Sequence, residues 1–209
     1  DVTRRLPLGF VFALKMGGKN KFILNHEVQR YLMTGLEKNI ACRKCLVLSM
    51  SRKLMTSIGL GVIVCFLVGF MAGQATKMSV KTWYANLEKP FFTPPDWLFA
   101  PIWTMLYLLM GIALGRVWYF SKNYNWGKTA IYYFCFQLLV NGLWSLVFFG
   151  LRKPILGMVV ILFLLFLIVK TLQQFKGIDL WATRLLYPYL IWVCFATLLN
   201  GGIVILNFL

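Results

Sequence analysis

The chain has 209 residues, of which 60% are hydrophobic and only 13% are charged, and its formal net charge is +16. Soluble domains are about half apolar and about a quarter charged, so this composition excludes an ordinary water-soluble protein. In so apolar a chain, the positive charge indicates basic ends and loops at anionic lipid headgroups, and no nucleic-acid partner is expected.

The first 49 residues are basic and show no sustained helical or strand period. They lack the apolar core and the small-residue cleavage site of a secretory signal. Met50 precedes Ser51, Arg52 and Lys53 and then a long apolar stretch. We therefore expect Met50 to be the biological start and residues 1–49 to be a disordered, non-native extension. A targeting peptide is the alternative.

Five apolar stretches are long enough to cross a bilayer, which takes about 20 residues in an α-helix. They cover approximately residues 54–76, 98–120, 126–149, 155–175 and 185–206. Backbone groups in hydrocarbon must be satisfied within their own segment, and these stretches are too long for barrel strands. The sequence therefore predicts an all-α, multi-pass membrane domain over residues 50–209, built as a bundle of five transmembrane helices.

The connection between the first two stretches is rich in proline and aromatic residues, where a plain connector would use Gly, Ser and charge. The residues in question are Trp83, Tyr84, Pro90, Pro94, Pro95 and Trp97. Proline fixes φ and removes a donor, so this segment cannot be a long helix. Its rings can fold onto the helix ends. We interpret it as a stiff, amphipathic lid over a cavity.

Side chains four residues apart share one face of a helix. Three stretches carry such a face: Phe99, Trp103 and Tyr107 in the second; Gln137, Asn141 and Ser145, with Trp144 beside them, in the third; and Trp192, Ala196 and Asn200 in the fifth. Inward Trp and Asn suit a pocket for a large, flat, apolar molecule with a few polar groups. Hydrogen bonding between helices is the alternative role for the two Asn residues. The fourth stretch has almost no such features, and we expect it to face lipid over most of its surface.

Glycine and cysteine spacings give weaker indications. Gly69 with Gly73, and Gly111 with Gly115, have the GxxxG spacing that packs helices within a bundle or across a dimer. Cys42 and Cys45 form a lone CxxC, and His26 is the only histidine. A zinc site needs about four ligands, so no metal site is expected.

The segment WYANLEKPFFTPPDWLFAPIWTMLYLLMGIALGRVW, which begins at Trp83, resembles the signature of the TspO/MBR family. This family comprises the tryptophan-rich sensory proteins of bacteria and the mitochondrial translocator protein, or peripheral benzodiazepine receptor. Further matches are QLLVNGLWSLVFFG in the third stretch and RLLYPYLIWVCFATLLN in the fifth. The resemblance covers Met50 to the end, with all five stretches in order.

The resemblance implies a five-helix bundle, often a homodimer, whose pocket lies under the first long loop and takes tetrapyrroles such as protoporphyrin IX and haem. It implies that no cofactor is required. Pocket positions of the family match Trp103, Tyr107, Asn141, Trp144, Trp192 and Ala196. In bacterial members the residues that match Trp103 and Trp192 are implicated in porphyrin degradation.

The sequence departs from the family pattern at several positions. Phe92 and Gly142 stand where the family has Trp, so ligand preference is expected to differ. Gly201 stands where the cholesterol motif of animal members has Tyr, and no Lys or Arg follows it. We therefore expect weak cholesterol binding and a bacterial cell membrane as the location, with a mitochondrial membrane as the alternative.

Three functions remain open from the sequence. The first is a protein that binds tetrapyrroles and senses or regulates their level. The second is an enzyme that degrades porphyrin photo-oxidatively, with Trp103 and Trp192 as its catalytic residues. The third is a porphyrin or lipid transporter, which the lack of a visible inverted repeat or broken helix disfavours.

Overall fold

The computed structural model describes residues 51–208 except 75, 78, 80 and 81. The predicted extension over residues 1–49 and the predicted start at Met50 lie outside the described residues.

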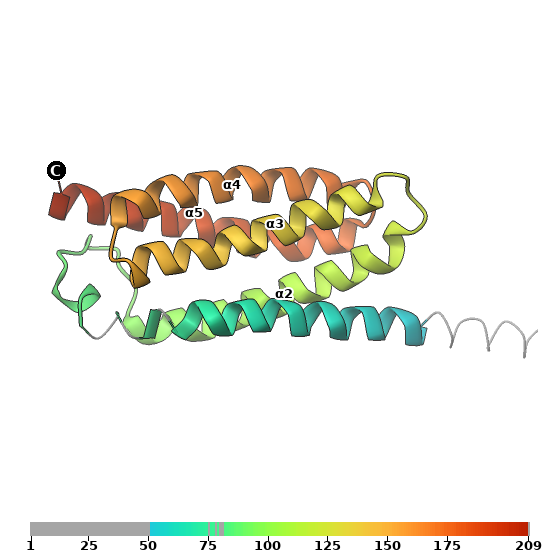
Figure 1. Cartoon of the computed structure of the whole chain (residues 1–209), viewed down its shortest axis with the longest axis horizontal. Helices are drawn as coiled ribbons and strands as arrows, with labels where there is room; N and C mark the ends of the chain where they lie inside the picture. Colours follow the sequence, from blue (N-terminus) through green and yellow to red (C-terminus); the bar gives the residue numbers. More distant parts are fainter. Residues whose placement is uncertain (1–50, 75, 78, 80–81, 209) are drawn as a thin grey trace, which may run out of the picture. The chain divides into compact units, whose positions relative to one another are not determined.

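Five helices in the part of the chain that the structure describes are long and apolar enough to cross a membrane. They are Ser51–Gln74, α2 (Asp96–Ser121), α3 (Gly127–Ser145) with its π-helical continuation η3 (Leu146–Gly150), α4 (Pro154–Lys176) and α5 (Leu180–Phe208) (Figure 1). No strand occurs among the described residues. The predicted fold class, an all-α bundle of five transmembrane helices, is confirmed.

Successive helices run in alternating directions, so the connections alternate between the two ends of the bundle (Figure 1). Contacts join α2 to α3, α3 to α4, α4 to α5 and α2 to α5. The loop of residues 82–95, the α3–α4 turn and the C-terminal end of α5 lie at one end. The short helix η2 (Tyr84–Asn86) lies within that loop.

The Ser51–Gln74 helix packs against α2 through glycine. A Cβ atom at Gly111 would overlap Val62, and a Cβ atom at Gly115 would overlap the backbone of Ile58. Small residues let two helix backbones approach this closely. The predicted Gly111–Gly115 pair therefore packs helices inside the bundle. A homodimer stays a prediction, and it must rest on another surface.

Helix α5 begins five residues before the predicted boundary at 185. The carboxylate of Asp179 explains the earlier start, because its Oδ1 accepts a hydrogen bond of 2.9 Å from the backbone N–H of Trp181. Its Oδ2 accepts one of 2.6 Å from Arg116 Nε on α2. The first turn of α5 is thus held by a carboxylate that also joins it to α2.

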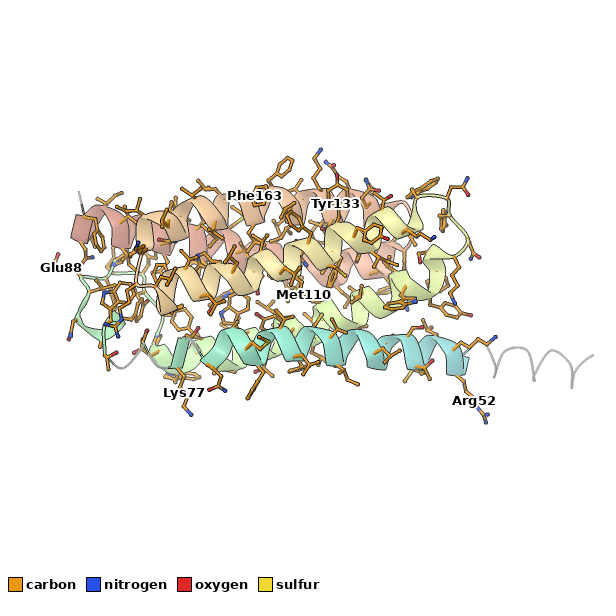
Figure 2. All side chains as sticks on the ribbon, viewed as in Figure 1. Arg52, Lys77, Glu88, Met110, Tyr133 and Phe163 are labelled. Atoms are coloured by element: carbon orange, nitrogen blue, oxygen red, sulfur yellow. The ribbon has the colours of Figure 1, made fainter. Side chains whose placement is uncertain are left out.

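The prediction that the fourth stretch faces lipid over most of its surface agrees with the large unburied share of α4, which is nevertheless no larger than that of α2 or α5. In α4, 39% of the most apolar window is buried, against 11% for the Ser51–Gln74 helix. Ile161, Leu164 and Ile168 of α4 are buried against the rest of the core, while Phe163 points outward (Figure 2). A uniformly apolar sequence conceals which side of a helix is buried, since lipid and protein interior select the same residues.

Candidate functional site

A narrow pocket with a cavity volume of about 20 Å³ lies at the loop end of the bundle, between α2, the α3–η3 segment and α5. It is lined by Tyr84, Phe99, Trp103, Trp144, Phe148, Phe149, Trp192, Phe195, Ala196, Leu199 and Asn200. Six of the eight predicted ligand-binding residues are in this lining. Tyr107 and Asn141 are not. Whether any of these residues binds a ligand stays a prediction.

Aromatic rings from two helices build one wall of the pocket. Trp103 on α2 lies 6.4 Å from Trp144 on α3, between ring centroids, and the two planes are tilted by 33°. Trp144 stacks in turn on Phe148, at 5.6 Å and 28°. Near-parallel rings present flat faces, which suit a flat apolar ligand.

Tyr107 and Asn141 lie beneath this wall and support it. The hydroxyl of Tyr107 donates a hydrogen bond of 2.7 Å to Asn141 Oδ1, and both side chains are buried. The ring of Tyr107 lies 5.6 Å from that of Trp103. A Cβ atom at Gly69 would lie 2.6 Å from the Tyr107 ring, so the glycine leaves room for it. These two residues position Trp103 without lining the pocket.

Asn200 lines the pocket, but its amide is bound to another helix. In the orientation that satisfies both polar atoms, Nδ2 donates to Pro154 O at 3.0 Å and Oδ1 accepts from Met158 N at 3.2 Å. Both partners lie in the first turns of α4. Asn200 therefore forms hydrogen bonds between helices, which is the alternative role that the sequence allows.

Four lining residues were missed by the sequence analysis: Phe148, Phe149, Phe195 and Leu199. The first two lie in η3, where the wide π-helical turn brings Val147, Phe148 and Phe149 inside together. Phe148 and Phe149 follow Trp144 and Ser145 by four residues, so a continued helical stripe would also have reached them. Phe195 and Leu199 follow Trp192 by three and seven residues, so a continued helical stripe could have found them.

Three hydrogen-bond donors of the lining are buried without a partner among the described residues. They are Tyr84 Oη, Trp144 Nε1 and Trp192 Nε1. Burial raises the pKa of Tyr84 to about 12, with Asp96 contributing. Tyr84 is therefore a neutral donor near neutral pH. An unpartnered buried donor is costly, and a ligand that carries acceptors would remove that cost.

The predicted lid contacts the pocket through its first half. The rings of Trp83 and Tyr84 lie 5.9 and 6.3 Å from Phe148. Glu88 N donates to Asn207 Oδ1, and Asn207 Nδ2 donates to Glu88 O, both at 2.9 Å. Pro90 rests on Gly202 of α5, where a Cβ atom would overlap the proline ring. The loop is thus fastened to the C-terminal end of α5.

The second half of the loop does not cover the pocket. Pro94 is half-buried, Pro95 is the N-cap of α2, and neither contributes to the lining. Trp97 belongs to the first turn of α2 and is 71% exposed, so its predicted place in the lid is wrong. Proline is well suited to the start of a helix, which explains why the helix begins so soon after the Pro-Pro pair.

Comparison with known proteins agrees with the sequence signature. The model of the TspO/MBR family matches residues 61–206. A tryptophan-rich protein TspO of Archaeoglobus fulgidus is 45% identical over 141 residues, which are 67% of this chain and 90% of the relative. A TspO protein of Chlorobaculum tepidum is 39% identical over 76% of this chain and 99% of its own length. The translocator protein of Bos taurus is 36% identical over 63% of this chain and 79% of its own length.

Proposed function

The chain belongs to the TspO/MBR family, and from this premise we propose that it is a membrane protein that binds a tetrapyrrole and senses or regulates its level. The observation that carries the proposal is the lining of the pocket. Three Trp residues meet there at the end of the bundle, and two of their indole N–H groups have no partner among the described residues.

The macrocycle and the propionate groups of a tetrapyrrole each match a part of this lining. Its macrocycle is flat and apolar, which suits the near-parallel rings of Trp103, Trp144 and Phe148. Its propionate oxygens are acceptors for the donors of Tyr84, Trp144 and Trp192. The cavity of about 20 Å³ is far below the range of about 300–1,000 Å³ for ligand sites, so the side chains must move apart to admit so large a ring.

The lining favours a metal-free tetrapyrrole over haem. Haem iron is held in proteins by His, Cys, Met or Tyr. Among the lining residues only Tyr84 is of these types, and its raised pKa disfavours the phenolate that would bind iron. Protoporphyrin IX is therefore the better probe.

A second candidate is oxidative degradation of the bound porphyrin. The observation that favours it is that Trp103 and Trp192 line the same pocket. Their ring contacts are with different neighbours: Trp103 with Tyr107 and Trp144, and Trp192 with Phe99 and Phe195. Two indoles would thus flank a ligand separately, and each could donate an electron to photo-excited porphyrin, while dioxygen would be the oxidant that ring degradation consumes.

One time course tests the proposal and separates the candidates. Protoporphyrin IX is added to the purified protein in lipid nanodiscs, and its Soret band is followed in darkness and in light. Binding predicts a saturable shift of the band, which stays stable in darkness and in light. Turnover predicts protein-dependent bleaching with a new product band. A spectrum that matches the one in empty nanodiscs at all protein concentrations would contradict both.

We also propose a bacterial cell membrane as the location. The support is the absence of the Tyr and basic residue that the cholesterol motif would need at and after Gly201. Fractionation of the source cells tests this.

A further inference from the structure

A second hollow lies between α2 and α5, outside the pocket, with a volume of about 460 Å³. It is lined by Ile102, Met105 and Leu106 from α2 and by Pro188, Ile191, Trp192 and Phe195 from α5. We call it the α2–α5 groove. Met105 and Ile191 are 49% and 68% exposed, and every lining residue is apolar.

The residues that line the groove belong to helices α2 and α5, which are long and apolar enough to span a membrane. Leu106 is ten residues into α2, about 15 Å along the helix axis. That is about half of a hydrocarbon core of about 30 Å. A hollow with apolar walls at this depth is in contact with acyl chains and with whatever apolar molecules are dissolved among them.

Two side chains separate the groove from the pocket. Trp192 and Phe195 line both, so they form the wall between them. We call them the gate residues. Their ring centroids are 5.4 Å apart, Trp192 also meets Phe99 at 6.0 Å, and Phe195 meets Phe92 at 6.2 Å. Trp192 Nε1 has no hydrogen-bond partner in the described part of the chain. Apolar ring packing is therefore what holds the gate.

The loop that closes the other side of the pocket is held more firmly than the gate residues are. Leaving the pocket on that side requires the loop to lift, which breaks the two 2.9 Å hydrogen bonds between Glu88 and Asn207. It also removes Pro90 from its seat on Gly202. Each hydrogen bond contributes to keeping the loop closed, whereas rotation of the gate residues breaks none that the structure records.

We propose that the α2–α5 groove is the portal through which the pocket's ligand exchanges directly with the bilayer, by rotation of Trp192 and Phe195. This inference rests on the proposed function, because it takes the occupant in transit to be the flat apolar molecule that the pocket holds. Such a molecule accumulates in hydrocarbon, so a lateral portal receives it without a passage through water.

The test compares exchange rates in variants that fill the groove without touching the pocket. Ile191→Trp and Met105→Trp add bulk from the two helices, at residues that line the groove and not the pocket. Leu139→Trp is the matched control, because Leu139 on α3 is 63% exposed and lines neither hollow. Asn207→Leu removes the hydrogen bonds that fasten the loop.

Each variant is reconstituted in phosphatidylcholine vesicles, and the association and dissociation of protoporphyrin IX are followed by its fluorescence. A lateral portal predicts that both groove variants slow association and dissociation by about tenfold or more, which equals about 1.4 kcal/mol in barrier height. It predicts an affinity within about twofold of wild type, since a portal changes rates and not the bound state. Leu139→Trp is expected to associate and dissociate at the wild-type rates, and Asn207→Leu is expected to associate at the wild-type rate.

Two results overturn the inference, and they are distinguishable. If wild type binds saturably but both groove variants exchange at its rate while Asn207→Leu speeds association, the ligand passes the loop, and the proposed function stands without the portal. If wild type shows no saturable binding, the proposed function fails and the portal fails with it.

Discussion

Among single residues, Tyr84 gives the clearest indication of a bound ligand, because its hydroxyl is buried without a hydrogen-bond partner in the described structure. The side chain is 2% exposed, its ring packs on Phe148 and Phe149, and Lys89 Nζ lies 4.5 Å from the ring centre. Its hydroxyl nevertheless has no partner in the described structure. Phenylalanine would make the same ring contacts without that cost, so the hydroxyl is better explained by binding than by folding.

Tyr84→Phe is therefore expected to raise the stability of the ligand-free protein and to lower its affinity for protoporphyrin IX. Removing the unpartnered hydroxyl should raise thermal stability without ligand by about 1 kcal/mol, and losing a donor should weaken protoporphyrin IX binding by about three- to tenfold. Thermal unfolding in detergent and a binding titration measure the two effects. A variant that is both more stable and equally tight in binding would show that the hydroxyl does not contact the ligand.

Substitutions at Trp103 and Trp192 distinguish porphyrin binding from porphyrin degradation. Phenylalanine keeps a flat apolar ring but is harder to oxidise than indole. Trp103→Phe and Trp192→Phe should each lose about 1 kcal/mol of aromatic contact with porphyrin, or about fivefold in affinity. If the protein degrades porphyrin, each variant should also lose most of the light-dependent bleaching. Bleaching at an unchanged rate in both variants would exclude an electron-donor role.

At the element scale, the contact of the loop with α5 depends on the absence of a single Cβ atom. A Cβ at Gly202 would overlap Pro90, whereas one at Gly201 would meet Met158 Cε at an ordinary 3.6 Å. Gly202→Ala should therefore displace the loop, and Gly201→Ala should not. Because Tyr84 is carried by this loop, we expect Gly202→Ala to weaken porphyrin binding by about tenfold, or about 1.4 kcal/mol.

Amide hydrogen exchange of residues 82–95 and a porphyrin titration measure this effect. Equal exchange in the Gly201→Ala and Gly202→Ala proteins would contradict the proposed seat of Pro90.

The glycine contact between the Ser51–Gln74 helix and α2 gives a second matched pair. A Cβ at Gly115 would overlap the backbone of Ile58, while no described atom lies within 4 Å of one at Gly73. Gly115→Ala should destabilise the bundle by about 1–3 kcal/mol. Gly73→Ala should be neutral or slightly stabilising, because alanine favours helix. Thermal unfolding of the two proteins tests this, and equal midpoints would mean that the helices are not packed this closely.

The five spanning helices are more predictable from the sequence than the residues that line the pocket. Length and hydropathy are sufficient to predict five spanning helices, because the bilayer fixes both. The stripe Trp192–Ala196–Asn200 was predicted for the same reason, since an α-helical period fixes which residues share a face. Phe148 and Phe149 lie four residues after Trp144 and Ser145, and they were missed because the predicted stripe ends at Ser145 and does not continue into η3.

Two other differences have physical causes. Trp97 is predicted in the lid because proline breaks helices, but proline also begins them, and α2 starts directly after Pro95. Asn141 and Tyr107 are predicted to face the pocket because polar residues in a span face inward. They do face inward, yet they bond to each other and lie outside the lining, while ligand binding by these residues stays a prediction.

In the whole domain, the pocket lies at one end of a five-helix bundle, with the loop on one side and the membrane on the other. Its loop side is closed by hydrogen bonds between Glu88 and Asn207. Its membrane side is closed by the rings of Trp192 and Phe195. A flat apolar molecule with polar acceptors suits this arrangement, because its apolar part can pass through lipid while its acceptors meet buried donors.

The measurement that tests this account most directly is a protoporphyrin IX titration of wild type, Ala196→Phe and Leu198→Phe in nanodiscs. Ala196 is 7% exposed and lines the pocket, and Leu198, two residues on in α5, is 67% exposed and lines neither hollow. If the pocket is the binding site, wild type and Leu198→Phe bind saturably, and Ala196→Phe binds at least about tenfold more weakly, because its ring takes up pocket space. Equal affinity of all three proteins, with helical content intact, would contradict the claim that this pocket is the binding site.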